Sequence, residues 1–270
     1  MVNLLKRQLA PVTDEAWAQI DTMALQIIKA NLTARALVDF SGPHGWELSA
    51  VNLGRIEIAP QEAPEGIPWG VRQVQPLIEV RLPVVLDQAE LDNASRGAKD
   101  IQLDPLKTAA RKLAHFEESA VYLGFEAGRI KGLIPSLSLP ALTTGVSGAL
   151  YPQAVTEAVE ALMGAGVGGP YALVLGPRPF HDLMEIARSG YPPYRIIREL
   201  LKGGEIHWSP ALTGGVILSK RGGDFELTVG QDISIGYAGH DRHHVELYLT
   251  ESFTFRVLEP TAAIELKFEE

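Results

Sequence analysis

After Thr13, hydrophobic residues recur every three or four positions, which is the spacing of one face of a helix. The Thr13 hydroxyl is suited to cap the first turn. Leu25, Leu32 and Ala36 widen the hydrophobic face beyond what a helix with one buried side needs. The pattern therefore predicts an amphipathic helix that reaches Ala36 and is covered on two sides, either by its own domain or by another molecule. The residues on its main face are Trp17, Ile20, Ala24, Ile27 and Ile28.

Hydrophobic residues in the next region alternate with polar ones, which is the period of a strand. Residues 55–58 alternate, and every second position from Ile78 to Leu86 is apolar. Residues 59–70 between them contain three prolines and cannot continue a sheet. The pattern predicts a long two-stranded arm with an irregular tip. Because an isolated hairpin is only marginally stable in water, either a partner subunit or the body of the chain must cover it.

A second helix is predicted from Asp104, as its cap, to about Gly128, with Pro105 at its first position. Helices and strands then mix over residues 135–223, and strands dominate to the end of the chain. The predicted elements of this part are helices 152–163, 179–188 and 194–201 and strands 171–175, 215–219, 225–229 and 244–257. The sequence therefore predicts an α+β protein.

Composition narrows the class of protein further. The chain has 270 residues and no cysteine, which excludes disulfides, thiolate metal sites and cysteine nucleophiles. Its formal net charge of −9 argues against a protein that coats nucleic acid. No apolar run has the pattern of a secretion signal or the length of a membrane span. We therefore expect a soluble, cytoplasmic protein whose partners include neither nucleic acid nor membrane.

Four short motifs were candidates for chemistry, and none builds a convincing active site. Residues 164–169 match G-x-G-x-x-G, but the predicted order of helix, turn and strand is the reverse of a dinucleotide site. Residues 145–149 lack the last glycine of a nucleophile elbow. The histidine-rich residues 240–244 lie in a predicted turn, and Glu117 and Glu118 are expected on a helix surface. The sequence therefore indicates no catalytic residue, no metal site and no cofactor.

Several short segments, spread in order over the whole chain, point to a known family. They include Leu5-Lys6-Arg7, Gly45-Trp46-Glu47, Gly169-Pro170-Tyr171, Arg221-Gly222-Gly223-Asp224-Phe225, Gly230-Gln231-Asp232-Ile233-Ser234-Ile235-Gly236-Tyr237 and Thr250-Glu251-Ser252-Phe253-Thr254-Phe255. Together they resemble family 1 encapsulin shell proteins, which share the fold of tailed-phage major capsid proteins (Hong Kong phage type).

This resemblance implies three parts of the fold. A P-domain would comprise residues 1–50, 84–134 and 224–270, an E-loop residues 51–83, and an A-domain residues 135–223. The implied function is self-assembly into an icosahedral shell of sixty subunits or a larger multiple. The shell would enclose a cargo enzyme, a ferritin-like protein or a dye-decolourising peroxidase, with a link to iron storage and oxidative stress. A prophage-derived capsid protein and a bacteriocin-like protease are the alternatives.

The resemblance also implies two sites. A C-terminal peptide of the cargo would bind between the first helix and a P-domain strand, in contact with Leu25, Ile28, Leu32, Arg35, Val38, Asp39, Asp232, Ile233 and Ile235. The spacing places Arg35 and Asp39 one helical turn apart, as a surface pair. A loop between two A-domain helices would line a pore through the shell with Arg188, Ser189, Gly190 and Tyr191.

Overall fold

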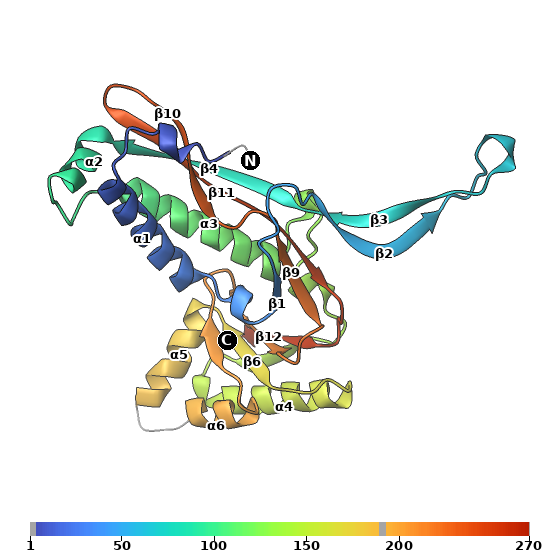
Figure 1. Ribbon diagram of the computed structural model, residues 1–270. Helices are drawn as coiled ribbons and strands as arrows, with labels where there is room; N and C mark the ends of the chain where they lie inside the picture. Colours follow the sequence, from blue (N-terminus) through green and yellow to red (C-terminus); the bar gives the residue numbers. More distant parts are fainter. Residues whose placement is uncertain (1–3, 189–192, 270) are drawn as a thin grey trace.

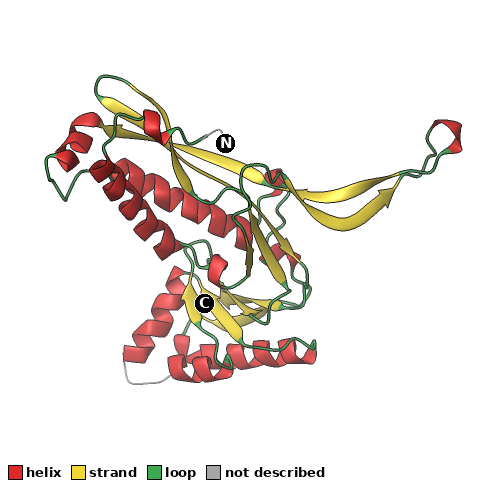
Figure 2. Cartoon of the chain, in the orientation of Figure 1, coloured by secondary structure: helices red, strands yellow, loops and turns green. Residues whose placement is uncertain are grey.

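The computed structural model describes residues 4–188 and 193–269, which form two sheets with their covering helices and a projecting hairpin (Figures 1 and 2). The first sheet has the order β1-β9-β11-β10, and β4 also pairs with β11. The second sheet has the order β5-β12-β8-β6-β7. The strands of the first sheet are β1 (Asp39–Ser41), β4 (Ile78–Asp87), β9 (Phe225–Val229), β10 (Ser234–His240) and β11 (His244–Val257). Those of the second are β5 (Leu142–Gly145), β6 (Tyr171–Leu175), β7 (Ile206–Trp208), β8 (Gly215–Ser219) and β12 (Ala263–Glu269).

Helices cover both sheets. α1 (Asp14–Asn31) and α3 (Asp104–Tyr122) lie side by side against the first sheet, with α2 (Gln88–Ser95) at one end (Figure 1). α4 (Tyr151–Gly164), α5 (Pro177–Arg188) and α6 (Pro193–Leu200) pack around the second sheet (Figure 2). This mixture of helices and mainly antiparallel strands confirms the predicted α+β class.

The first helix begins where the sequence predicts but ends earlier. The Thr13 hydroxyl accepts a hydrogen bond from the backbone N–H of Ala16, at 3.4 Å, as expected of a cap. The helix stops at Asn31, because Leu32 is extended and the chain then turns into a short 3₁₀ segment, Ala34–Ala36. The prediction that the helix reaches Ala36 was wrong, and residues 32–39 do not continue its faces.

The second predicted helix, α3, is also shorter than predicted. Asp104 is its first residue rather than its cap, and it ends at Tyr122. Gly124 follows with a φ of +93°, and a Cβ there would lie 2.3 Å from the carbonyl oxygen of Lys131. A glycine is therefore needed at the point where the chain leaves the helix.

The projecting hairpin, which we call the arm, consists of β2 (Ala50–Ile58), β3 (Gly70–Pro76) and the tip between them (Figure 1). The predicted pairing of the arm was wrong in one respect. The alternating strand from Ile78 onward is present, but it is β4, and it pairs with β11 over its whole length, from Phe253↔Ile78 to His244↔Asp87. An alternating pattern fixes which side chains share a face and leaves the partner strand open.

The last strand belongs to the second sheet. β12 pairs with β5 and β8, which lie in residues 135–223, so residues 263–269 are part of the second sheet. The alternation of this strand again fixes its faces and not its neighbours.

The hydrophobic core has two clusters. One fills the second sheet and its helices and extends to β9 and to Phe253 and Phe255 of β11. The other lies between α1, α2, α3 and the strands β4, β10 and the first half of β11, as far as Leu249. β11 therefore runs through both clusters, and residues 250–252 lie where they meet.

None of the helices within residues 4–188 and 193–269 is both long and apolar enough to cross a membrane.

Candidate functional site

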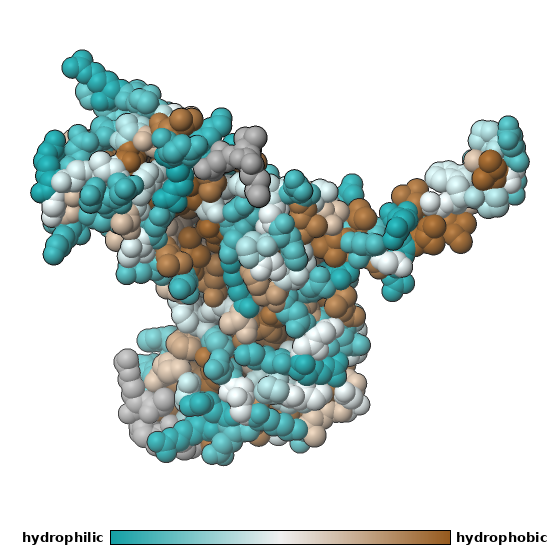
Figure 3. Space-filling view, viewed as in Figure 1, coloured by the Kyte–Doolittle hydropathy of each residue, from teal (hydrophilic) through white to brown (hydrophobic). Residues whose placement is uncertain are grey.

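A groove lies between α1 and the beginning of β10, and its far wall is closed by the N-terminal segment. We call it the α1–β10 groove; its volume is about 260 Å³. Leu25 is 52% exposed at its rim. In Figure 3 a hydrophobic area lies beside α1. The lining residues are Leu5, Arg7, Asp21, Ala24, Leu25, Ile28, Ile233, Ser234, Ile235 and Leu249. The groove is thus mainly apolar, with charged groups at one end.

The helical period explains how α1 forms one wall. Trp17, Ile20 and Ala24 face the core and are buried, whereas Leu25 and Ile28 stand at the edge of that face. Ala24 has a small side chain, which leaves room above the core for a bound group. The last two turns of this helix therefore do carry apolar side chains beyond those that face the core, as the sequence predicted.

The N-terminal segment is held in place at the charged end of the groove. Arg7 forms an ion pair with Asp21 at 2.7 Å, and its guanidinium lies 3.9 Å from the ring centre of Trp17. The backbone N–H of Tyr237 donates to the carbonyl oxygen of Leu5 at 2.8 Å, so the segment runs beside β10.

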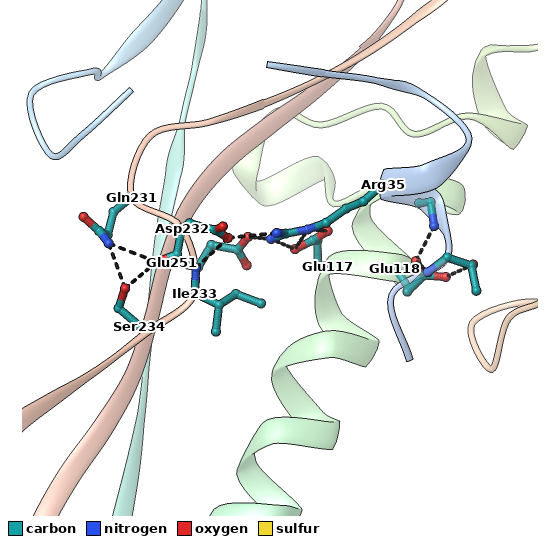
Figure 4. A network of polar contacts seen from close by, with 10 residues as sticks. Arg35, Glu117, Glu118, Gln231, Asp232, Ile233, Ser234 and Glu251 are labelled. Atoms are coloured by element: carbon teal, nitrogen blue, oxygen red, sulfur yellow. Dashed lines mark hydrogen bonds and ion pairs between the residues drawn. The ribbon is translucent and has the colours of Figure 1, made fainter. Parts of the chain in front are cut away.

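The loop before β10 is held by a network of four charged residues, Arg35, Glu117, Asp232 and Glu251 (Figure 4), which we call the Arg35 network. The Arg35 guanidinium donates to both Glu117 oxygens, with Nε–Oε1 at 2.8 Å and Nη2–Oε2 at 2.6 Å. It also donates to Asp232 Oδ1 at 2.8 Å and to Glu251 Oε1 at 2.5 Å. Asp232 Oδ1 in turn accepts the backbone N–H of Ile233 at 2.8 Å. One arginine therefore connects α3 and β11 to a wall of the groove.

Glu118, the neighbour of Glu117 on α3, fixes the chain after α1. Its carboxylate accepts the backbone N–H groups of Thr33 and Ala34, each at 2.7 Å, and the hydroxyl of Ser209 at 2.6 Å. Burial raises the pKa of Glu118, and these hydrogen bonds oppose the shift. Glu117 and Glu118 are both fully buried, so the prediction of a helix surface for this pair was wrong.

The structure brings some of the predicted cargo-binding residues together and separates others. Four of them, Leu25, Ile28, Ile233 and Ile235, line the groove. Arg35 and Asp232 meet in the Arg35 network at its edge. Leu32 caps the end of α1 and is not among the lining residues.

Val38 and Asp39 line a different hollow, next to Asp224 and Phe225. Asp39 accepts the backbone N–H of Gly223 at 2.6 Å and begins β1. The predicted helical pair of Arg35 and Asp39 was therefore wrong, because the helix ends before either residue.

Sequence reasoning missed the N-terminal wall of the groove, formed by Leu5 and Arg7, and the two buried acids of the Arg35 network. One signal for Glu251 was present. An acidic residue in the middle of a strand rich in aromatic and β-branched residues needs a partner wherever that strand is buried. The sequence predicted this strand but not the burial that makes a partner for Glu251 necessary.

The other predicted features lie in three places. Residues 164–169 form the turn between α4 and β6, as predicted, and residues 240–244 form the turn between β10 and β11. Of the predicted pore residues, Arg188 ends α5. Ser189, Gly190 and Tyr191 lie outside the described residues.

Comparison with protein families gives a match over residues 2–254 to the family described as "Encapsulating protein for peroxidase". A type 1 encapsulin shell protein of Rhodospirillum rubrum is 45% identical, over 98% of this chain and 97% of that protein. Similar proteins of Rhodococcus erythropolis and Mycobacterium tuberculosis are 40% and 38% identical, each over 98% of this chain and 99–100% of their own length.

Solved structures agree on the fold. A virus-like particle from Pyrococcus furiosus superposes with a TM-score of 0.67 at 17% identity, over 93% of this chain and 99% of that one. The capsid of an empty GTA particle and the capsid of the Myoviridae phage XM1 give TM-scores of 0.56 and 0.53, each over 89% of this chain and 97% and 92% of theirs. Their identities of 16% and 14% mean that they bear on the fold alone. The chain has the capsid-protein fold that the sequence predicted.

Proposed function

The chain belongs to the family of type 1 encapsulin shell proteins, and from this premise we propose that its copies assemble into a closed icosahedral shell around a cargo enzyme. The shell has sixty subunits or a larger multiple. The relatives are named as shell proteins, and this chain is likewise a structural protein and not an enzyme. In the shell, the first sheet with α1 and α3 acts as the P-domain, the arm as the E-loop and the second sheet as the A-domain.

The arm supports self-association. Ile56, Ile58 and Val71 are between 57% and 73% exposed, and Ile67 and Trp69 at the tip are about half exposed. Figure 3 shows this hydrophobic surface on the part of the arm that extends away from the body. Exposed apolar surface of this kind marks a contact with another molecule, and neighbouring copies in a shell would supply it.

The α1–β10 groove is the observation that carries the proposal of cargo binding. It is open and mainly apolar, and its volume suits two or three side chains of an extended segment. Arg7 and Asp21 at one end and Ser234 in the wall provide polar groups that fix the register of a bound peptide. We propose that the C-terminal segment of the cargo docks there.

The cargo class follows from the family. Its description names a peroxidase as the encapsulated protein. We propose a dye-decolourising peroxidase or a ferritin-like protein as cargo, with a role in iron storage or oxidative stress and a cytoplasmic location. The predicted loop from Arg188 to Tyr191 would line the pore through which small substrates enter.

Cargo loading in the native host tests the groove. Ile28→Asp places a charge in the apolar part of the groove. Removing that charge from water when a peptide binds costs well over the roughly 1.4 kcal/mol that corresponds to a tenfold loss of affinity. Shells should therefore form but contain less than a tenth of the wild-type cargo. Gln26→Asp is the matched control, because Gln26 is an exposed residue of the same helix outside the groove.

Mass spectrometry of purified particles measures the ratio of cargo to shell protein. Full loading of the Ile28→Asp particles would rule out the groove as the docking site. Particles filled with nucleic acid would point instead to a phage capsid.

A further inference from the structure

The Arg35 network contains more acidic side chains than basic ones, and most of it is buried. Three carboxyl groups surround one guanidinium, and the side chains of Glu117 and Glu251 are fully buried, whereas that of Asp232 is 41% exposed. Two adjacent buried carboxylates repel each other strongly, and a single arginine cannot neutralise both together with Asp232. A buried cluster of this composition is stable when one of its acids keeps a proton.

The hydrogen bonds identify which acid keeps it. Glu117 accepts from Arg35 on both of its oxygens, which is the arrangement of an ionised carboxylate. Glu251 accepts only on Oε1, and no described residue donates to its buried Oε2. Glu117 Oε2 and Glu251 Oε1 both accept from Nη2 of Arg35, so the two carboxyl groups are neighbours. A proton on Glu251 would remove the repulsion between the two carboxyl groups, and the buried Oε2, which accepts no hydrogen bond, is the oxygen available to carry it.

Electrostatics agrees with this assignment. Burial raises the pKa of Glu251 well above its ordinary value, and the charges of Glu117 and Asp232 raise it further, against the opposing effect of Arg35. Among the described residues, the charged groups that act on Glu251 are these three, from α3, from the loop before β10 and from the 3₁₀ segment.

We propose that Glu251 is the proton-holding member of the Arg35 network, and that loss of this proton to solvent loosens the loop of residues 231–234 and thereby the α1–β10 groove. The inference rests on the proposed function, since it concerns regulation of the same groove. It also makes Arg35 a positioning residue that holds Asp232 and does not contact the cargo.

The contact between Arg35 and Asp232 is the one that gives way. When Glu251 ionises, Arg35 is drawn toward two buried carboxylates to which no other described side chain donates. Asp232 is partly exposed and water can replace the arginine there, so releasing it costs least. Asp232 then no longer fixes the backbone of Ile233, which lines the groove.

Linkage gives the size of the effect. In the open loop Arg35 interacts with Glu117 and Glu251 alone, so the pKa of Glu251 is lower there than in the closed loop, where burial and the neighbouring acids raise it. Between these two values the opening equilibrium rises about tenfold per pH unit, and above the closed-state value it levels off. The groove is therefore tightest at low pH and loosens as the pH rises.

Hydrogen–deuterium exchange on assembled shells between pH 5 and 9 tests this, with rates corrected for the intrinsic pH dependence of exchange. In the wild type, exchange of residues 231–235 should rise about tenfold per pH unit until it levels off. In Glu251→Gln the profile should be flat, because the amide is neutral like the protonated acid and its oxygen can still accept from Arg35. Glu246→Gln changes an exposed residue of the same strand and should follow the wild type.

Parallel profiles for the wild type and Glu251→Gln would overturn the proposal. If Glu251→Gln does not assemble, Glu117→Gln can replace it in the experiment. With one of the two buried glutamates changed to an amide, the network no longer contains two carboxylates that repel each other, so no proton has to be held and the exchange profile should again be flat. Infrared spectroscopy gives a direct reading of the proton. The wild type at pH 7 should show a carboxylic-acid C=O band that Glu251→Gln lacks, and absence of that band from the wild type would contradict the proposal.

The same shells separate the two proposals. If Ile28→Asp keeps its cargo, the groove assignment fails whatever the exchange profiles show. If Ile28→Asp loses its cargo while wild type and Glu251→Gln exchange alike, the groove stands and the proton switch fails.

Discussion

The two sheets bury different kinds of residue. In the second sheet, the central strands β6 and β8 are buried at every position, and apart from Ser219, which donates to the carbonyl oxygen of Gly168 at 2.7 Å, their side chains are apolar or aromatic. In the first sheet, β11 is buried from Leu247 to Phe255, yet it carries Thr250, Glu251 and Ser252 in the middle. These three lie where the two core clusters meet.

The difference shows what each region is built for. An apolar core such as that of β6 and β8 gains stability from burial alone. A buried ion network is a weak source of stability, because desolvation cancels much of the attraction between its charges. The Arg35 network is therefore better explained by a positioning role than by a contribution to stability, because it holds the loop beside the α1–β10 groove in place. Four predictions test this contrast, beginning with the largest expected effect on stability.

Removing the arginine should damage the first sheet most. Arg35→Ala leaves Glu117 and Glu251 buried without their cation, at a cost of about 3–5 kcal/mol per subunit. We expect few shells, a markedly lower midpoint of thermal unfolding, and no cargo in those that form. Differential scanning calorimetry of purified particles measures the shift. An unfolding midpoint within a degree of the wild-type value would mean that Arg35 does not offset a repulsion between the buried carboxylates.

An apolar truncation in the second sheet should reduce stability and leave loading intact. Leu173→Ala in β6 removes a fully buried side chain, at a cost of about 3 kcal/mol. The particles that assemble should carry wild-type amounts of cargo per subunit. Calorimetry together with mass spectrometry of the same particles gives both values. Loss of cargo comparable to that of Ile28→Asp would erase the contrast between the two sheets.

The pH dependence of stability should distinguish Glu251 from surface acids. Because its pKa is raised in the folded state, the unfolded chain releases the proton first as the pH rises above about 4.3. Wild-type subunits therefore lose up to about 1.4 kcal/mol per pH unit until the raised pKa is reached, relative to Glu251→Gln. Glu118, whose pKa is also raised, adds a slope that both proteins share.

Denaturation of wild type and Glu251→Gln between pH 5 and 9 compares the two directly. Equal slopes for the two proteins would show that Glu251 titrates alike in the folded and unfolded chain.

Replacing Arg35 and its two buried acids with apolar residues should change stability least. Arg35→Met, Glu117→Leu and Glu251→Leu together make this part of β11 resemble β6, and such replacements are often neutral or stabilising. The triple variant should form shells of normal thermal stability that load poorly, because Asp232 is no longer held. Normal loading would show that the groove does not need the network.

Much of the fold could be predicted from local sequence, because its determinants are local. The cap at Thr13, the spacing of the apolar residues in α3 and the β composition of β11 each fix an element without reference to the rest of the chain. The capsid fold itself followed from resemblance and not from pattern. Strand alternation gave the faces of β4, but it contained no information about the partner of this strand.

The candidate site could be predicted only in part, because its geometry depends on distant residues. The end of α1 is set by Glu118, which lies 85 residues away from Thr33 and takes the amides that a longer helix would have used. The same turn moves Arg35 out of the helix and toward Glu251, which is 216 residues away. The apolar residues Leu25, Ile28, Ile233 and Ile235 line one groove, and the sequence could group them only because resemblance supplied the long-range pairing.

Cryo-electron microscopy of cargo-loaded shells from the native host tests the central claim most directly. The account predicts density for an extended peptide in the α1–β10 groove, with an apolar side chain between Ile28 and Ile233, and no such density in shells of the Ile28→Asp variant. Loaded shells with an empty groove, and cargo density at another surface, would contradict it.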